Sequence, residues 1–249
     1  MRALLTICLA LLSFNVASAA DIKLLTAGAF KSVAMELVPV FERNTGHKVI
    51  IENDTAGGLA KRIAGGEAFD VAVLPPAALS PLVTSGKVVD GSTKPLAKVG
   101  IGVAVKKGAP LPDIGDVEAF KRALLAARAI AYIDPAAGGT SGIYLAQLFD
   151  KMGIGAALRP ESVLVPGGLV ADWVVRGEAE IGLQQASEIL AVPGATLVGP
   201  IPAAVQSYTI YAGGIGAGAR DPAAARALLA AFSGNAVAAV LKAKGMETP

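Results

Sequence analysis

Short apolar runs alternate along most of the chain with longer stretches whose apolar positions recur at helical spacing. The run 22–26 is typical of a strand, and residues 33–41 place apolar side chains on one face of a helix that Gly46 can end. This alternation is the pattern of an α/β protein with mainly parallel sheets. It predicts strands at 22–26, 48–52, 69–76, 99–105, 130–133, near Val163, at 179–183 and at 207–215, and helices at 33–41, 59–63, 117–127, 143–152, 169–176 and 222–244.

The two ends of this pattern are expected to meet in space. The strand 207–215 and the alanine-rich helices of 222–244 belong packed against the first βαβαβ half, so the chain leaves one lobe and returns to it. We therefore expect two lobes, with residues 21–100 and 205–249 in the first and residues 101–204 in the second.

Residues 1–20 have the pattern of a secretory signal peptide, because Arg2 precedes the apolar run 3–12 and small residues follow at 17–20. The apolar run is too short to span a bilayer. Cys8 lies too far from the small-residue cleavage region to serve as a lipid-attachment site. The sequence therefore predicts a free periplasmic protein.

Composition narrows the possible chemistry. Loss of Arg2 with the signal leaves one basic residue fewer than the 22 of the whole chain, against 20 acidic residues, which gives no reason to expect nucleic acid or a membrane surface. The only cysteine lies in the signal, so cysteine catalysis and cysteine ligation of a metal are excluded. Motifs for metal binding by paired carboxylates, for a nucleophile elbow and for a phosphate loop with its lysine are absent. We expect a monomer without a metal or cofactor.

Candidate binding chemistry lies where expected strands lead into helices. The segment DPAAGGTSGIY, residues 134–144, is such a junction, and the N–H groups and dipole of a helix N-terminus attract anions. Its glycines allow close approach of a ligand, and Thr140 and Ser141 add hydroxyl donors. Four junctions of this kind, two in each half, predict an anion site between the lobes. The other three are TAGAFKS at 26–32, NDTAGGLAKR at 53–62 and VPGGLV at 165–170.

Four longer segments carry a family resemblance. They are TAGAFKSVAMELVPVFERNTGHKV, LAKRIAGGEAFDVAVL, DPAAGGTSGIYLAQLFDKMGI and VVRGEAEIGLQQASEI. In this order, over nearly the whole mature chain, they resemble the type II periplasmic solute-binding proteins of ABC transporters, and in particular the molybdate-binding group. The resemblance implies two α/β lobes, joined by two hinge crossings, that close over a ligand in the cleft and deliver it to an ABC transporter permease.

The resemblance also places the ligand contacts. Where the family's molybdate site typically has serine, this chain has Ala29 and Gly57, and it has Gln185 in place of a tyrosine. Several hydroxyl donors to a tetrahedral oxyanion are therefore missing, and a carboxylate fits the altered donors at least as well as a molybdate-like oxyanion. The residues expected to bind the ligand are Ala29, Phe30, Lys31, Thr55, Gly57, Gly58, Thr140, Ser141, Gly167, Gly168 and Gln185.

An enzymatic alternative remains open, because a branch of this fold family resembles aconitate isomerase. That reaction is an allylic proton shift on a tricarboxylate, which needs a base and an acid beside the ligand. Lys31 is the candidate, since it lies in the first turn of a helix that should face the cleft. Glu188 or Asp172 could assist, whereas His47 is expected in a surface loop. The sequence thus predicts a binding protein for a small oxyanion or organic acid, with an isomerase as the alternative.

Overall fold

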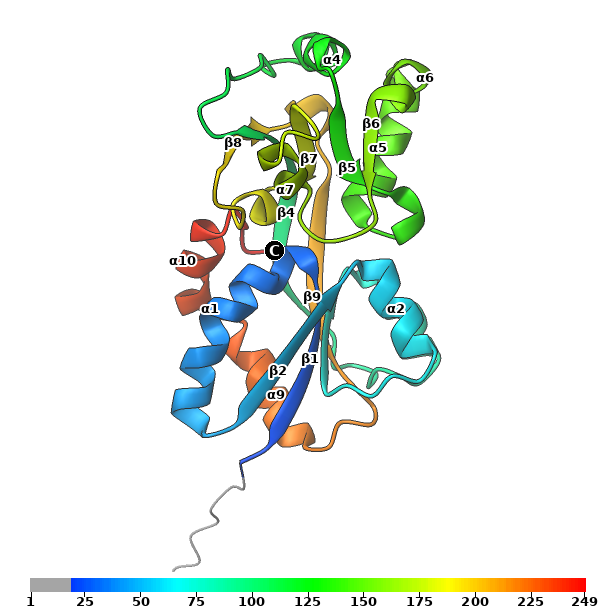
Figure 1. The fold of residues 1–249 in the computed structure, drawn as a ribbon. Helices are drawn as coiled ribbons and strands as arrows, with labels where there is room; N and C mark the ends of the chain where they lie inside the picture. The colour runs from blue at the N-terminus through cyan, green and yellow to red at the C-terminus, as the bar shows by residue number, and fades with distance from the viewer. Residues whose placement is uncertain (1–18) are drawn as a thin grey trace, which may run out of the picture.

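The computed structural model describes residues 19–249, so the expected signal peptide falls almost wholly outside the described residues. These residues form two lobes, one above the other in Figure 1. No helix in the described part of the chain is both long and apolar enough to cross a membrane. The strands are β1 (Asp21–Ala27), β2 (Lys48–Asp54), β3 (Val71–Leu74), β4 (Lys94–Lys106), β5 (Ile130–Ile133), β6 (Ser162–Val165), β7 (Ile181–Gln185), β8 (Ala195–Pro200) and β9 (Tyr208–Ile215). The α-helices are α1 (Gly28–Thr45), α2 (Ala56–Ala64), α3 (Pro76–Thr84), α4 (Val117–Ala126), α5 (Thr140–Lys151), α6 (Gly155–Leu158), α7 (Val170–Val175), α8 (Ala186–Ile189), α9 (Pro222–Ala231) and α10 (Asn235–Ala243), and the 3₁₀ helices are η1 (Pro135–Ala137), η2 (Arg159–Glu161) and η3 (Ala203–Val205).

Strand β4 joins the two lobes. Its residues 94–100 pair with β9, and its residues 101–106 pair with β7 and β8. The strands follow the order β2-β1-β3-β9-β4-β7-β5-β6, with β8 added beside β4. We call the part built on β1, β2, β3, β9 and the start of β4 lobe 1, and the part built on the end of β4 with β5 to β8 lobe 2. In Figure 1, β4 and β9 run through the junction between the lobes.

The expectation of mainly parallel sheets is wrong at the centre of the molecule. The pairs β1–β2, β1–β3, β5–β6 and β5–β7 are parallel, as βαβ units require. However, β9 runs antiparallel to both β3 and β4, and β4 runs antiparallel to β7 and β8. The cause is the path of the chain, which crosses into lobe 2 along β4 and returns along β9 in the opposite direction.

Local signals in the sequence explain the ends of the elements. Gly46 ends α1 with a φ of 76°, and its N–H donates to the carbonyl of Glu42, as the glycine signal predicts. The sequence pattern does not predict helix α3, because two prolines after a buried strand indicate only the end of that strand. Pro76 in fact opens α3, a position where the missing N–H costs nothing.

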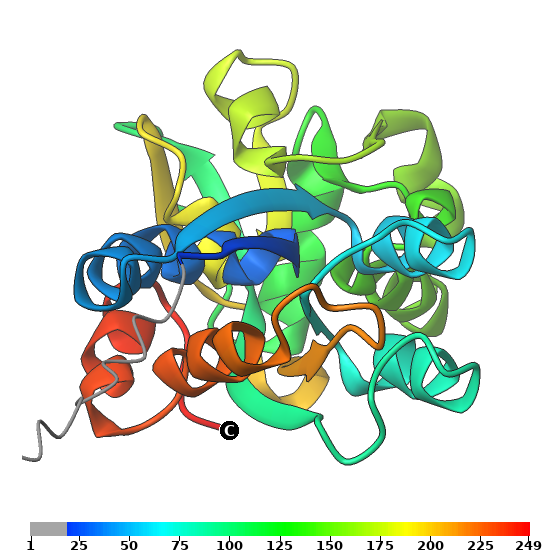
Figure 2. The ribbon, with the colours of Figure 1, turned by 90° about the horizontal axis from the view of Figure 1, so that it is seen from below.

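Each lobe has its own hydrophobic core. In lobe 1, α1, α9 and α10 lie on one side of the sheet and α2 and α3 on the other (Figure 2). Phe30 of α1 meets Phe232, just after α9, edge to face, with ring centroids 5.4 Å apart. The C-terminal helices therefore pack on the N-terminal part of the chain, which fixes α1 relative to the sheet and so positions its N-terminus.

Candidate functional site

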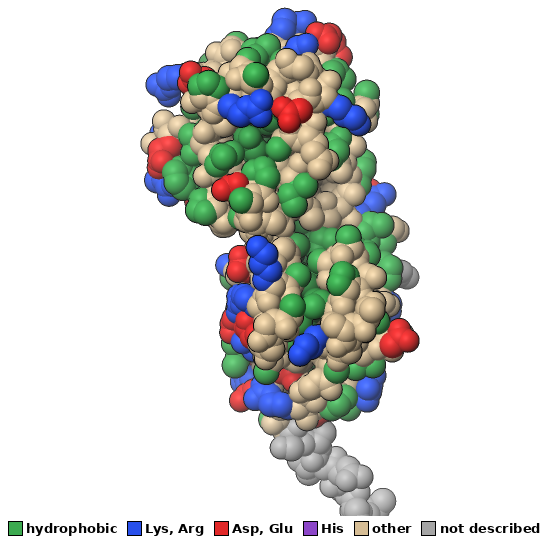
Figure 3. Space-filling view, turned by 90° about the vertical axis from the view of Figure 1, so that its right-hand side faces the viewer, with side chains coloured by type: hydrophobic (Ala, Val, Ile, Leu, Met, Phe, Trp, Pro, Cys, Tyr) green, Lys and Arg blue, Asp and Glu red, His purple; other side chains and the backbone are tan. Residues whose placement is uncertain are grey.

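A small cavity lies between the two lobes, at the level where the surface of the molecule is indented (Figure 3). Its volume is about 50 Å³, room for only a few water molecules. Both lobes contribute to its wall, and most of the lining residues lie at the carboxyl ends of strands or the starts of helices, whereas Tyr211 lies within β9. The lining residues are Ala27, Gly28, Ala29, Asn53, Asp54, Thr55, Ala56 and Tyr211 from lobe 1, and Ile133, Gly139, Thr140, Ser141, Gly168, Leu169 and Glu188 from lobe 2.

Four helix N-termini meet at this cavity, those of α1, α2, α5 and α7. The N-caps of α1 and α5 are Ala27 and Gly139, and neither provides a side-chain cap. The first N–H groups of these two helices are therefore available to an anionic ligand. Helix α2 differs, because the hydroxyl of Thr55 already accepts a hydrogen bond from the N–H of Gly58 at 3.0 Å.

Hydrogen bonds connect the lobes around the cavity. The N–H of Gly57 donates to the carbonyl of Gly138 at 3.0 Å, and the hydroxyl of Thr55 donates to the carbonyl of Ala137. On the other side, the buried hydroxyl of Ser187 donates to the carbonyl of Ala29 at 2.9 Å. A Cβ on Gly57 would lie 2.9 Å from the Cα of Gly138, so only glycine permits this approach. The structure is thus a closed arrangement of the two lobes.

Glu188 brings an acid into the cavity. It follows β7 on the short helix α8 and is partly buried. Its Oε1 lies 2.5 Å from the position a Cβ on Gly28 would take, so the carboxyl group occupies space that glycine leaves at the start of α1. Removal from bulk water raises the pKa of Glu188 from its ordinary 4.5 to about 8. The group therefore holds a proton at neutral pH.

A chain of polar side chains leads away from the cavity. The side-chain N–H₂ of Gln185 donates to the hydroxyl of Thr209 at 2.9 Å and to that of Thr140 at 3.3 Å, while the Oε1 of Gln185 is buried without a hydrogen-bond partner among the described residues. Burial, with the nearby charge of Glu188 as a second cause, raises the pKa of Tyr211 above its ordinary value. Tyr211 therefore faces the cavity as a neutral phenol.

Of the described residues, 19–249, those that line the cavity include two carboxyl groups but no lysine, arginine or histidine. The carboxylate of Asp54 accepts from the N–H of Thr55 at 2.7 Å and lies 3.9 Å from the guanidinium of Arg62. Its charge is thus partly balanced from outside the cavity. Backbone dipoles and hydroxyl groups would have to bind an anion here.

The structure brings some of the expected ligand residues together and places others elsewhere. Ala29, Thr55, Thr140, Ser141 and Gly168 line the cavity. The other six expected residues are not part of its wall, although Gly57 and Gln185 are involved in the contacts around it. These six residues are Phe30, Lys31, Gly57, Gly58, Gly167 and Gln185.

Positions on α1 show why neighbouring residues differ so much. Phe30 is fully buried in the lobe 1 core, and Lys31, the next residue, is exposed. A helix that buries Phe30 turns Lys31 about 100° away from it, toward solvent. The surface position expected for His47 is wrong, since the residue is only 8% exposed. Its ring stacks on Phe41, and its Nδ1 accepts a hydrogen bond from the N–H of Ala20 at 3.0 Å.

Sequence reasoning missed Tyr211, Asn53 and Asp54 as cavity residues, and it named Glu188 without a geometric reason. A usable signal exists for Asn53 and Asp54, because they end a parallel strand and such ends face ligand sites. For Glu188 and Tyr211 the sequence offers only one signal of a place in the cavity, which is that each is a polar residue in or next to a predicted strand. Of the two acids named earlier, Asp172 is exposed and does not line the cavity, whereas Glu188 does.

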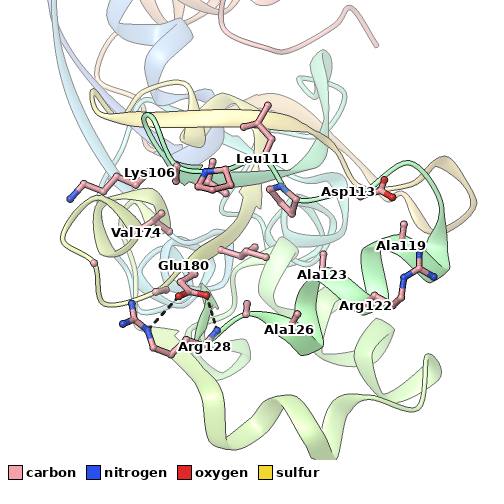
Figure 4. Close-up of a pocket in the computed structure, with 18 residues that line it drawn as sticks. Lys106, Leu111, Asp113, Ala119, Arg122, Ala123, Ala126, Arg128, Val174 and Glu180 are labelled. Carbon is pink, nitrogen blue, oxygen red and sulfur yellow. Dashed lines mark hydrogen bonds and ion pairs between the residues drawn. The ribbon is translucent and has the colours of Figure 1, made fainter.

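A much larger groove lies on lobe 2 alone, between α4, the loop after β4 and the start of β7 (Figure 4). Its volume is about 660 Å³, and alanine side chains of α4, including Ala119, Ala123 and Ala126, form one wall. Arg128 and Glu180 on its border form a salt bridge with each other at 3.6 Å. Size alone would favour this groove as a binding site, but its polar groups do not converge on a common point as those of the cavity do.

Comparisons with known proteins agree on the fold. A family model described as bacterial extracellular solute-binding protein matches residues 22–247. The chain is 36% identical over 229 residues to a Pseudomonas protein named aconitate isomerase, a match covering 90% of this chain and 86% of that one.

Solved structures of low sequence identity share the architecture. The Azotobacter vinelandii periplasmic molybdate-binding protein superimposes with a TM-score of 0.77 at 21% identity, covering 92% of this chain and 99% of that one. The sulfate-binding protein SubI from Mycobacterium tuberculosis gives a TM-score of 0.74 at 16% identity, covering 92% and 87% of the two chains. These likenesses confirm the expected two-lobe periplasmic binding protein fold with a cleft between the lobes.

Proposed function

Because the chain belongs to the bacterial extracellular solute-binding protein family, we propose that it binds a small organic-acid anion between its lobes. In this role it acts in the periplasm as the solute-binding component of an ABC transporter. The observation that carries the proposal is the meeting of the uncapped N-termini of α1 and α5 at one closed cavity. Two helix dipoles and their free N–H groups favour negative charge at that point.

Two features favour a carboxylate over molybdate or sulfate. Ala29 and Gly57 offer no hydroxyl group, and the N–H of Gly57 is already bonded to Gly138. The relative at 36% identity is named for an enzyme that acts on a tricarboxylate. A cavity of about 50 Å³ leaves room for a small acid at most, and a tricarboxylate would require the lobes to stand further apart.

The test is a thermal shift series on the protein without residues 1–20. The ligands are molybdate, tungstate, sulfate and phosphate beside lactate, succinate, citrate, cis-aconitate and trans-aconitate. A ligand at a hundred times its Kd stabilises the native state by about 2.7 kcal/mol, which gives a clear rise in Tm. Stabilisation by an organic acid and not by molybdate or sulfate is the expected result. Stabilisation by molybdate alone, or by no anion, contradicts the proposal.

The pair of Glu188 and Tyr211 favours a second function, isomerisation of the bound acid. In an allylic shift a base removes a proton from the methylene carbon, the double bond moves by one position, and an acid returns a proton to the former vinyl carbon. A carboxyl group with a pKa of about 8 can perform either transfer near neutral pH. Both side chains line the cavity and can reach a ligand there.

This second function is tested by incubating cis-aconitate and trans-aconitate separately with the protein and resolving the products by chromatography. Interconversion is expected to be lost in Glu188→Gln, which cannot transfer a proton, and retained in Asp172→Asn, whose side chain is exposed. Stabilisation by aconitate without any interconversion would leave binding as the function.

A further inference from the structure

An acid in an anion site requires an explanation. Glu188 lines a cavity whose other polar groups are hydroxyls, an amide, backbone N–H groups and Asp54. Its carboxylate has no hydrogen-bond partner among the described side chains and backbone groups, although it lies beside the Cα of Gly28. A ligand bound in the cavity would lie where it can pair with this carboxyl group.

Within the part of the chain that the structure describes, no positively charged side chain lines the cavity around Glu188. From β9 it is faced by the neutral phenol of Tyr211, and from the end of β2 by Asp54. Helices α1 and α5 contribute uncharged residues to the wall, and Lys31 of α1 is exposed to solvent. Arg62 lies behind Asp54, paired with Glu52 and Glu67. An ionised Glu188 would therefore be a second negative charge beside a bound anion, in a narrow space between the lobes.

Two like charges so placed repel strongly, and the group that gains a proton most easily will take one. We propose that the cavity binds its anion together with one proton, held by Glu188, so that the carboxyl group donates a hydrogen bond to the ligand. This inference rests on the proposed function in that it assumes an anion in the cavity. Glu188 would then select ligands that can accept a hydrogen bond from its protonated carboxyl group.

The acid–base behaviour of Glu188 defines the pH range. With a pKa of about 8, the free protein already holds the proton near pH 7, and an anion beside the group raises that pKa further. Affinity for an anion that has no proton of its own should be constant at lower pH. Above about pH 8 it should fall about tenfold per pH unit, because each binding event must then take up a proton.

The experiment is isothermal titration calorimetry of succinate or trans-aconitate, whichever binds, in two buffers of different ionisation enthalpy between about pH 6.5 and pH 9.5. The difference in heat counts the protons taken up. Wild type should take up almost none at about pH 6.5 and close to one at about pH 9.5. Glu188→Gln, which keeps a donor of similar size, should take up no proton, and its affinity should not change with pH across the range.

The matched control is Asp54→Asn, which removes the other acid of the cavity and should leave the proton uptake in place. Affinity of the wild type that does not change with pH, or uptake that persists in Glu188→Gln, would overturn the inference while leaving the binding function standing. Failure of every anion to bind wild type at any pH would instead refute the proposed function. Circular dichroism melting of each variant separates loss of folding from loss of binding.

Discussion

The interlobe cavity is small and lined by polar groups, whereas the lobe 2 groove is large and lined mainly by apolar side chains. The cavity has about 50 Å³ and is lined by helix starts, hydroxyls and two acids, whereas the groove has about 660 Å³ and an alanine wall. The chain is packed so tightly at and beside the cavity that an added methyl group at Gly28, Gly57 or Gly142 would meet another atom at 2.9 Å or less. Convergent polar groups and tight packing mark a built site better than volume does.

The largest effect that would sharpen this contrast is expected at Gly142, in the first turn of α5. A Cβ there would lie 2.0 Å from the carbonyl oxygen of Ile133, which is backbone and cannot move freely. Gly142→Ala should therefore lower the free energy of unfolding by about 3 kcal/mol. Urea denaturation measures the change, and Gly218→Ala, with open space around its Cβ, is the control. Equal stability of the two variants would show that the junction is not tightly packed.

The next effect concerns Glu188 and the dependence of stability on pH. Because its pKa is raised in the folded state, the unfolded chain loses the proton first, so Glu188 lowers stability as pH rises from about 4.5 to about 8. Glu188→Gln removes this loss. Because Glu188 is only partly buried, contact with solvent reduces the loss, and we expect a gain of about 2 kcal/mol at pH 9, with little gain at pH 4. Melting curves at the two pH values provide the measurement. A gain that is the same at both pH values would exclude an ionised, desolvated Glu188 as its cause.

A smaller effect is expected at the contact between the lobes. Gly57→Ala places a methyl group 2.9 Å from the Cα of Gly138, so the lobes cannot approach as closely. Ligand affinity should fall about tenfold, or about 1.4 kcal/mol, through partial loss of closure. Calorimetry with the best ligand tests this, again beside Gly218→Ala. Unchanged affinity in Gly57→Ala would show that the ligand does not need this contact.

The smallest effect is expected in the groove. Ala126 is exposed on the groove wall, so Ala126→Leu should change the unfolding free energy by no more than about 0.5 kcal/mol. It should also leave anion affinity within about twofold of wild type, since the groove is separate from the cavity wall. The same calorimetric titration provides the check. A loss of anion affinity as large as that in Gly57→Ala would show that the groove and the cavity are coupled.

The sequence was sufficient for elements that depend on local signals. Apolar spacing and Gly46 define α1, and the glycine-rich junction before α5 marked Thr140 and Ser141, which do line the cavity. Whether the central strands run parallel or antiparallel could not be predicted in this way, because β4 and β9 pair although more than 100 residues separate them in the sequence. Local periodicity contains no information on such distant pairs.

The site shows the same limit. Gly28 and Glu188 are 160 residues apart in sequence, yet they share one space, and neither residue alone indicates the other. Lys31 was attractive because helix starts face the cleft, but the burial of Phe30 fixes the rotation of α1 and turns Lys31 outward. Knowledge of one buried neighbour was needed to choose between the two faces of the helix.

The contact between Gly57 and Gly138 joins the lobes through main-chain atoms alone. The contact requires glycine at position 57 but involves no side-chain atom, so it does not depend on which side chains surround the ligand. Substitutions at Glu188 or Tyr211 can therefore alter ligand preference while the closing movement is inherited unchanged. A fold that separates these two properties can acquire new ligands, or gain and lose a chemical step, through few mutations over evolutionary time.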